Sequence, residues 1–104
     1  MLKYLAALSF ALLSSASVLA ASDDAWAQFA KEVEEACRAA TSSILTNAQA
    51  VVDPFGSESY GLAILTGDAA PGVTKSIVCV FDKQTKAVEI GGELDLAVPP
   101  VTPQ

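Results

Sequence analysis

The stretch SDDAWAQFAKEVEEACRAATSSIL, residues 22–45, places apolar side chains three and four positions apart. This spacing predicts one amphipathic helix. Its apolar stripe would consist of Trp26, Phe29, Ala30, Val33, Cys37, Ala40 and Ile44. Ser22 or Asp23 is a suitable cap for the first turn. Glu34 and Arg38 stand four residues apart in the order that favours an ion pair along a helix.

Beyond the helix, the spacing of the apolar side chains changes. The polar run at residues 41–43 weakens the helix, and Asn47 is the candidate for its end. Alternation then predicts strands at residues 48–52, 60–66, 74–81 and 87–90. Turn-forming residues at 67–72 and 82–86 are expected to link successive strands. The predicted fold is therefore α+β, with one N-terminal helix packed on an antiparallel sheet of about four strands. The order of the strands is left open.

The first 20 residues have the pattern of a secretory signal peptide, with Lys3 before an apolar core at 5–13 and cleavage after Ala20 or Ala21. A transmembrane anchor is the alternative, but the core is shorter than the roughly 20 residues that a span needs. No cysteine stands directly after the cleavage site, so no lipid anchor is expected. The predicted organisation is a signal peptide at 1–20, a small α+β domain at 21–93 and a proline-rich extended tail at 94–104. In a Gram-negative source, the mature chain would be soluble in the periplasm.

Export places the two cysteines of the mature chain in an oxidising compartment, where thiols form disulfides. Cys37 and Cys79 allow a single pairing. The predicted disulfide would close a loop of about 43 residues, which corresponds to roughly 4 kcal/mol in the chain-entropy model. Two buried free thiols are the alternative. A catalytic thiol pair would need a closer spacing, such as C-x-x-C.

The composition narrows the classes of function. Once Lys3 is removed with the signal peptide, five basic residues stand against twelve acidic ones, a net charge of about −7. Such a charge repels nucleic acid and anionic membranes and attracts basic partners, or simply keeps an exported protein soluble. The chain has no histidine, which removes the commonest acid–base group and most zinc sites. Phosphate-loop, nucleophile-elbow and EF-hand motifs are also missing. We therefore expect a protein that is not an enzyme and binds neither a cofactor nor a metal.

The stretch VVDPFGSESYGLAIL, residues 51–65, interrupts the strands with turn-forming and aromatic residues. Asp53, Pro54 and Gly56 fit the first, second and fourth positions of a type I turn. A rigid turn loses little entropy when it docks, so we predict that this loop binds a partner. The predicted contact residues are Phe55, Ser57, Glu58, Ser59 and Tyr60. In the alternative interpretation, Phe55 folds back onto the helix and Tyr60 caps the core.

Several features together resemble the small periplasmic lysozyme inhibitors of Gram-negative bacteria. They are the signal peptide, the size, the single disulfide, the acidity and the loop GSESYG at residues 56–61. The resemblance covers this loop and these general features. It implies that the loop enters the active-site cleft of a basic c-type lysozyme, for example that of a host, with Ser57, Ser59 and Tyr60 as contacts. It would also imply that family's usual all-β barrel, whereas the residues themselves predict an α+β fold. The alternative is a structural or accessory envelope protein without inhibitory activity, which could dimerise through a sheet edge.

Overall fold

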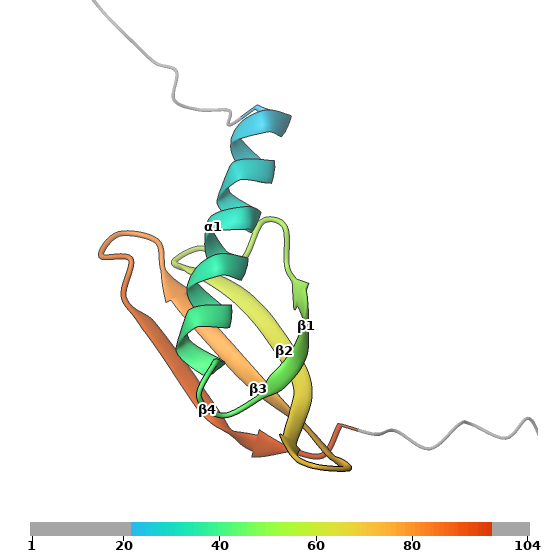
Figure 1. The fold of residues 1–104 in the computed structure, drawn as a ribbon. Helices are drawn as coiled ribbons and strands as arrows, with labels where there is room; N and C mark the ends of the chain where they lie inside the picture. Colours follow the sequence, from blue (N-terminus) through green and yellow to red (C-terminus); the bar gives the residue numbers. More distant parts are fainter. Residues whose placement is uncertain (1–21, 97–104) are drawn as a thin grey trace, which may run out of the picture.

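The computed structural model describes residues 22–96. The predicted signal peptide and residues 97–104 of the predicted tail lie outside this range. The described chain forms α1 (Asp23–Thr41), β1 (Thr46–Val52), β2 (Tyr60–Ala70), β3 (Val73–Asp82) and β4 (Val88–Leu94). The strands form one antiparallel sheet in the order β1-β2-β3-β4, with α1 packed against it (Figure 1). The α+β prediction is confirmed, and the helical layer differs from the all-β barrel that the resemblance implied.

The start of α1 follows from its local sequence. Ser22 is the cap, because its hydroxyl accepts a hydrogen bond from the Ala25 amide at 3.1 Å. Arg38 Nε donates to a carboxylate oxygen of Glu34 at 2.8 Å, which confirms the predicted ion pair. Both side chains are exposed to solvent, so this pair adds only a few tenths of a kcal/mol, roughly, to the stability of the helix.

The end of α1 differs from the prediction, because the helix stops at Thr41 rather than continuing towards Asn47. The Thr41 hydroxyl donates to the Cys37 carbonyl at 2.9 Å. Threonines that bond back to the preceding turn in this way weaken a helix. The Ile44 and Leu45 amides then both donate to the Thr41 carbonyl, which closes a turn. Ile44 therefore belongs to this turn, and Asn47 lies in β1 with a φ of 54°.

The core lies between α1 and one face of the sheet. Successive side chains of a strand point to opposite faces, and those that face the helix are buried. The buried apolar residues are Val33, Cys37, Leu45, Ala63, Leu65, Ile77, Cys79 and Phe81. The disulfide between Cys37 and Cys79 joins α1 to β3 in the middle of this layer, with the two Cα atoms 5.9 Å apart. The predicted pairing is confirmed.

All four strands are longer than predicted, and the differences at β2 and β4 change the links that follow them. β2 continues through Gly67 to Ala70, so the link expected at 67–72 shrinks to a turn at Pro71 and Gly72. Gly67 is required by close packing, because a Cβ there would lie 2.7 Å from the Thr46 carbonyl oxygen of β1. β4 extends to Leu94, the first residue of the predicted tail. The hairpin connection predicted at 82–86 is confirmed.

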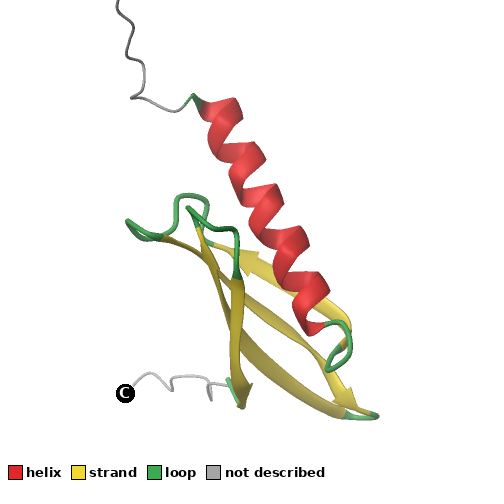
Figure 2. Cartoon of the chain, turned by 90° about the vertical axis from the view of Figure 1, so that its left-hand side faces the viewer, coloured by secondary structure: helices red, strands yellow, loops and turns green. Residues whose placement is uncertain are grey.

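The second face of the sheet is not covered by any helix of residues 22–96 (Figure 2). We call it the open face and define it by the apolar side chains that point away from α1. These are Val51 of β1, Leu62 and Ile64 of β2, and Val78 and Val80 of β3. No helix in the described chain is long and apolar enough to cross a membrane.

Candidate functional site

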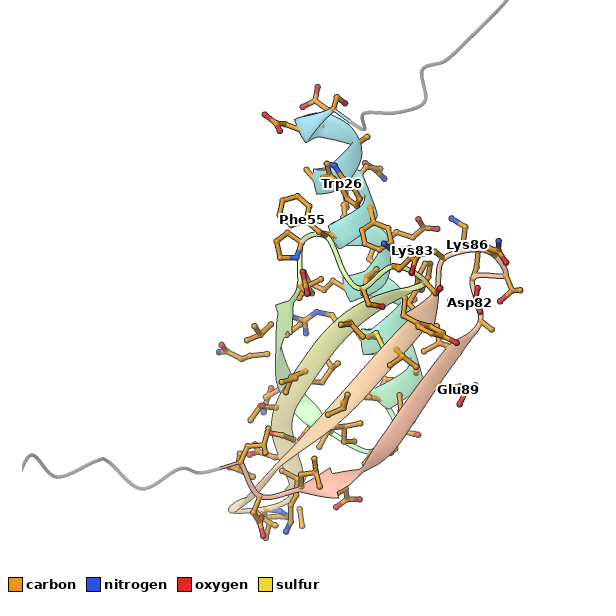
Figure 3. The ribbon with its side chains drawn as sticks, turned by 180° about the vertical axis from the view of Figure 1, so that it is seen from behind. Trp26, Phe55, Asp82, Lys83, Lys86 and Glu89 are labelled. Atoms are coloured by element: carbon orange, nitrogen blue, oxygen red, sulfur yellow. A yellow bond between two sulfur atoms is a disulfide. The ribbon has the colours of Figure 1, made fainter. Side chains whose placement is uncertain are left out.

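The predicted binding loop and the β3–β4 hairpin lie at the same end of the sheet. The loop joins β1 to β2, and the hairpin joins β3 to β4. In an antiparallel sheet of four consecutive strands, the first and third connections lie at the same end of the sheet. We call this end the tip and define it as residues 53–60 and 82–86 together with Trp26. Figure 3 shows Trp26, Phe55, Lys83 and Lys86 gathered there.

Asp53 shapes the first half of the binding loop. Its Oδ1 accepts hydrogen bonds from the amides of Phe55 and Gly56, both at 3.0 Å. The reversal predicted at 53–56 is present, but the side chain of Asp53 is the acceptor of the Gly56 amide. Gly56 has a φ of +74°, and a Cβ on it would lie 2.3 Å from the Tyr60 carbonyl oxygen. Only glycine fits this position without strain.

A second tight turn closes the loop between Ser57 and Tyr60. The Ser57 amide donates to the Tyr60 carbonyl at 2.8 Å, and the Tyr60 amide donates to Ser57 Oγ at 3.1 Å. The Ser57 hydroxyl therefore holds the shape of the loop. The hydroxyls of Ser59 and Tyr60 have no hydrogen-bond partner, and the Glu58 carboxylate has no ion pair, within residues 22–96.

Lys83 ties the two connections of the tip together. Its Nζ donates to the carbonyls of Phe55 and Ser57 at 3.0 and 2.6 Å, and its amide donates to the Ser59 carbonyl at 3.0 Å. The same ammonium lies 5.6 Å from the centroid of the Trp26 ring, within cation–π range. Lys83 of the β3–β4 hairpin thus holds the backbone of the binding loop in place. No pattern in the sequence indicates this role of Lys83, because its partners are 26 and 28 residues away along the chain.

Phe55 packs against the helix rather than projecting from the loop. Its ring meets Trp26 edge to face, with the centroids 5.2 Å apart, and Trp26 meets Phe29 in the same way at 5.9 Å. Phe55 nevertheless remains 56% exposed. The fold-back of Phe55 agrees with the alternative interpretation of the loop, while the exposed part of its ring stays accessible to a partner.

Tyr60 lies on the other side of the tip. A Cβ on the next residue, Gly61, would point at Val33 of α1, so strand alternation directs Tyr60 towards the open-face side. Tyr60 is 43% exposed and does not cap the core. It borders a polar hollow of about 460 Å³ lined by Glu58, Ser59, Tyr60, Asp82, Lys83 and Gln84. The structure thus brings Glu58, Ser59 and Tyr60 together, and it separates them from Phe55.

Asp82 repeats the arrangement of Asp53, because its Oδ1 accepts from the amides of Gln84 and Thr85 at 2.8 and 3.0 Å. Within residues 22–96, no group of three or more His, Cys, Asp or Glu side chains is placed to hold a metal ion. The hollow instead offers free hydroxyls and a free carboxylate on a fixed backbone.

Comparisons with protein-family models, with curated proteins and with solved structures find no match to this chain. Function is therefore inferred from the geometry of the tip and of the open face.

Low pH is expected to destabilise the two turns of the tip that Asp53 and Asp82 cap. Hydrogen bonds from the amides of Gly56 and Phe55 lower the pKa of Asp53 below its ordinary value of 3.8. The amides of Thr85 and Gln84 do the same for the pKa of Asp82. A carboxyl group whose pKa is lower in the folded state stabilises the fold above its unfolded pKa, and this contribution is lost as the pH falls through the folded pKa. We expect the free energy of unfolding to fall as the pH drops below 3.8, as measured by urea denaturation.

The double variant Asp53→Asn/Asp82→Asn separates these two turns from the other carboxylates. Asparagine keeps an acceptor oxygen but does not titrate, so the variant should lose less stability than the wild type over the same acidic range. Equal losses in both proteins would show that the two turns contribute nothing to the acid sensitivity.

Proposed function

We propose that the mature chain is an exported, non-enzymatic binding protein of the periplasm that holds a basic partner protein at the tip. The observation that carries this proposal is the fixed loop. Lys83 and the two tight turns hold its backbone, while Glu58, Ser59 and Tyr60 line the hollow with polar groups that have no partner in the described chain. A loop ordered before binding loses little conformational entropy when it docks.

The charges of the tip support a basic partner. The Lys83 ammonium is committed to two carbonyls, and the Lys86 ammonium pairs with Glu32 at 2.8 Å. Glu58 lies in the hollow without an ion pair of its own within the described residues. Together with the net charge of the mature chain, this attracts a cationic protein at a rate that falls with added salt.

A c-type lysozyme is the specific partner that we propose, because it is the target that the resemblance implies. Two features support a role as an inhibitor rather than an enzyme. The chain has no histidine, and both of its cysteines form the disulfide. The geometry of the loop refines the contact set. Ser59 and Tyr60 are the contacts, since Ser57 uses its hydroxyl to shape the loop.

The test is the double variant Ser59→Ala/Tyr60→Ala, assayed for inhibition of cell-wall lysis by lysozyme. We expect inhibition to weaken by about tenfold or more, because the variant removes both free hydroxyls and an exposed aromatic ring. The thermal midpoint should change by no more than a few degrees, roughly. Ser43→Ala/Val73→Ala is the matched control, since it removes one hydroxyl and one large exposed side chain at the opposite end of the molecule.

The outcomes separate clearly. Lysis that proceeds unchanged at a large molar excess of the wild-type protein would end the inhibitor proposal. A loss of stability without a change in inhibition would mean that Tyr60 acts in packing only. Retention on immobilised lysozyme that declines across a salt series would support an electrostatic contact.

A structural or accessory envelope protein that dimerises through a sheet edge is the second candidate. One observation favours it: β1 and β4 are both edge strands, and unpaired strand edges are templates for pairing with another chain. Such a protein would sediment as a dimer and leave lysozyme unaffected. A monomer in solution would contradict it.

A further inference from the structure

The open face is a continuous apolar surface. The register pairs Val51 with Ile64 and Ile64 with Val78, so three side chains form a row across three strands. Leu62 and Val80 form the next row. A shallow hollow of about 350 Å³ opens between them and is lined mostly by aliphatic side chains. Val51 is 72% exposed and Val78 39%. Contiguous apolar surface of this kind usually marks an interaction site in a soluble protein.

The two ends of the open face differ. At the end remote from the tip, Thr66 Oγ1 and Ser76 Oγ lie 2.7 Å apart, and Ser76 is only 3% exposed. Asp95 and Leu96, which follow β4, line a hollow of about 260 Å³ together with Thr66 and Ser76. That end of the face is therefore more polar than its centre, because hydroxyls replace the aliphatic side chains there.

The border of the open face is acidic at the tip end and along β4. Asp53 lines the apolar hollow beside Val51, and Asp82 continues the row of outward positions along β3. Glu89 of β4 stands opposite Val80 in the register, and Figure 3, which views the sheet from the side away from α1, shows Glu89 at the β4 edge. At the end of the sheet remote from the tip, Lys75 Nζ forms an ion pair with Asp95 Oδ1 at 2.8 Å. Carboxylates thus border the apolar centre at the tip end and along the β4 edge.

This combination selects one kind of occupant. An apolar sheet face is normally covered by a helix that lays its apolar stripe on it, as α1 does on the opposite face. The acidic border requires that the flanks of such a helix be basic. A second copy of this chain fits poorly, because it would bring three more carboxylates, and no basic side chain of the open face, to the contact.

We propose that the open face binds a basic amphipathic α-helix of a partner protein, which completes a helix–sheet–helix sandwich. This inference goes beyond the proposed function, because it concerns the sheet face and does not depend on lysozyme inhibition. The apolar stripe of the helix covers Val51, Ile64 and Val78, and its lysines or arginines meet the carboxylates at the border.

The probe is the fluorescently labelled peptide LKKLLKLLKKLLKL, which presents leucine on one helical face and lysine on the other. The protein from residue 21 to its end is added to the labelled peptide, and binding is followed by fluorescence anisotropy. We expect saturable binding in the micromolar range, which corresponds to about −8 kcal/mol, and about tenfold weaker binding by Val51→Thr/Val78→Thr. These substitutions keep the β-branched shape and place hydroxyls on the face. The control is Val73→Thr, at a 41% exposed valine in the β2–β3 turn region, which should leave binding unchanged.

Four results would overturn the proposal. One is no binding of the peptide by the full chain. Another is equal binding by Val51→Thr/Val78→Thr, which would mean that the net negative charge of the protein, and not the apolar open face, binds the peptide. Binding only after residues 97–104 are deleted would mean that this chain's own segment occupies the face. A dimer that Val51→Thr/Val78→Thr dissociates would make the face an interface between copies. Lysozyme inhibition should be the same in Val51→Thr/Val78→Thr as in the wild type, so the two proposals fail independently.

Discussion

Reduction of the Cys37–Cys79 disulfide is expected to lower the free energy of unfolding by about 4 kcal/mol. The bond joins residues 42 positions apart and connects α1 to β3 across the core. Its loss lets the unfolded chain explore conformations that the cross-link forbids, which stabilises the unfolded state. A domain of this size has a total stability of roughly 5–10 kcal/mol, so the reduced protein should keep only about 1–6 kcal/mol and unfold at a much lower urea concentration. Urea denaturation with and without reductant measures the difference.

The double variant Cys37→Ala/Cys79→Ala is the control for the effects of the reductant. Both cysteines are fully buried, so this variant should lose the cross-link and a small amount of packing as well. Its unfolding midpoint should lie at or below that of the reduced wild type. Titration of the unfolded, unreduced protein should detect no free thiol. Two titratable thiols, or a reduced protein as stable as the oxidised one, would contradict the structural role of the bond.

The elements that could be predicted from the sequence are those set by local chemistry. The Ser22 cap and the Glu34–Arg38 pair involve residues three or four apart, and both are confirmed. The disulfide can be predicted because two cysteines in a chain with the pattern of an exported protein have one possible partner each. The end of α1 was misplaced because the Thr41 hydroxyl competes for a helical carbonyl, an effect that apolar spacing does not reveal.

Features that depend on how the strands pair could not be predicted. Gly67 was interpreted as a turn residue, but it is a strand residue that lets β1 approach closely. Lys83 reaches across 28 and 26 positions to the carbonyls of Phe55 and Ser57, a contact that follows only from a meander order. That order was left open. The direction of Phe55 is likewise set by Trp26 of another element.

Gly56→Ala is expected to destabilise the protein far more than Gly72→Ala, although the two glycines have almost the same backbone conformation. Their φ angles are +74° and +75°. An alanine at either position is therefore forced into the left-handed region, at a cost of roughly 1–2 kcal/mol. The surroundings differ. No atom lies within 4 Å of a Cβ placed at Gly72, whereas a Cβ at Gly56 would lie 2.3 Å from the Tyr60 carbonyl oxygen.

The clash at Gly56 involves a backbone atom, so the loop itself must move. The Tyr60 carbonyl accepts the Ser57 amide at 2.8 Å, and its displacement breaks the turn that presents Ser59 and Tyr60. We expect Gly56→Ala to lower the free energy of unfolding by about 3 kcal/mol, against about 1–2 kcal/mol for Gly72→Ala. Urea denaturation of the two variants side by side gives the comparison. Both variants carry the same backbone cost of a positive φ angle. The difference between their free energies of unfolding therefore measures the cost of the contact between the new Cβ and the Tyr60 carbonyl oxygen. Equal losses of stability would show that the loop accommodates this Cβ without strain. If the tip is the binding surface, Gly56→Ala should also lose partner binding under conditions where it remains folded, while Gly72→Ala keeps it.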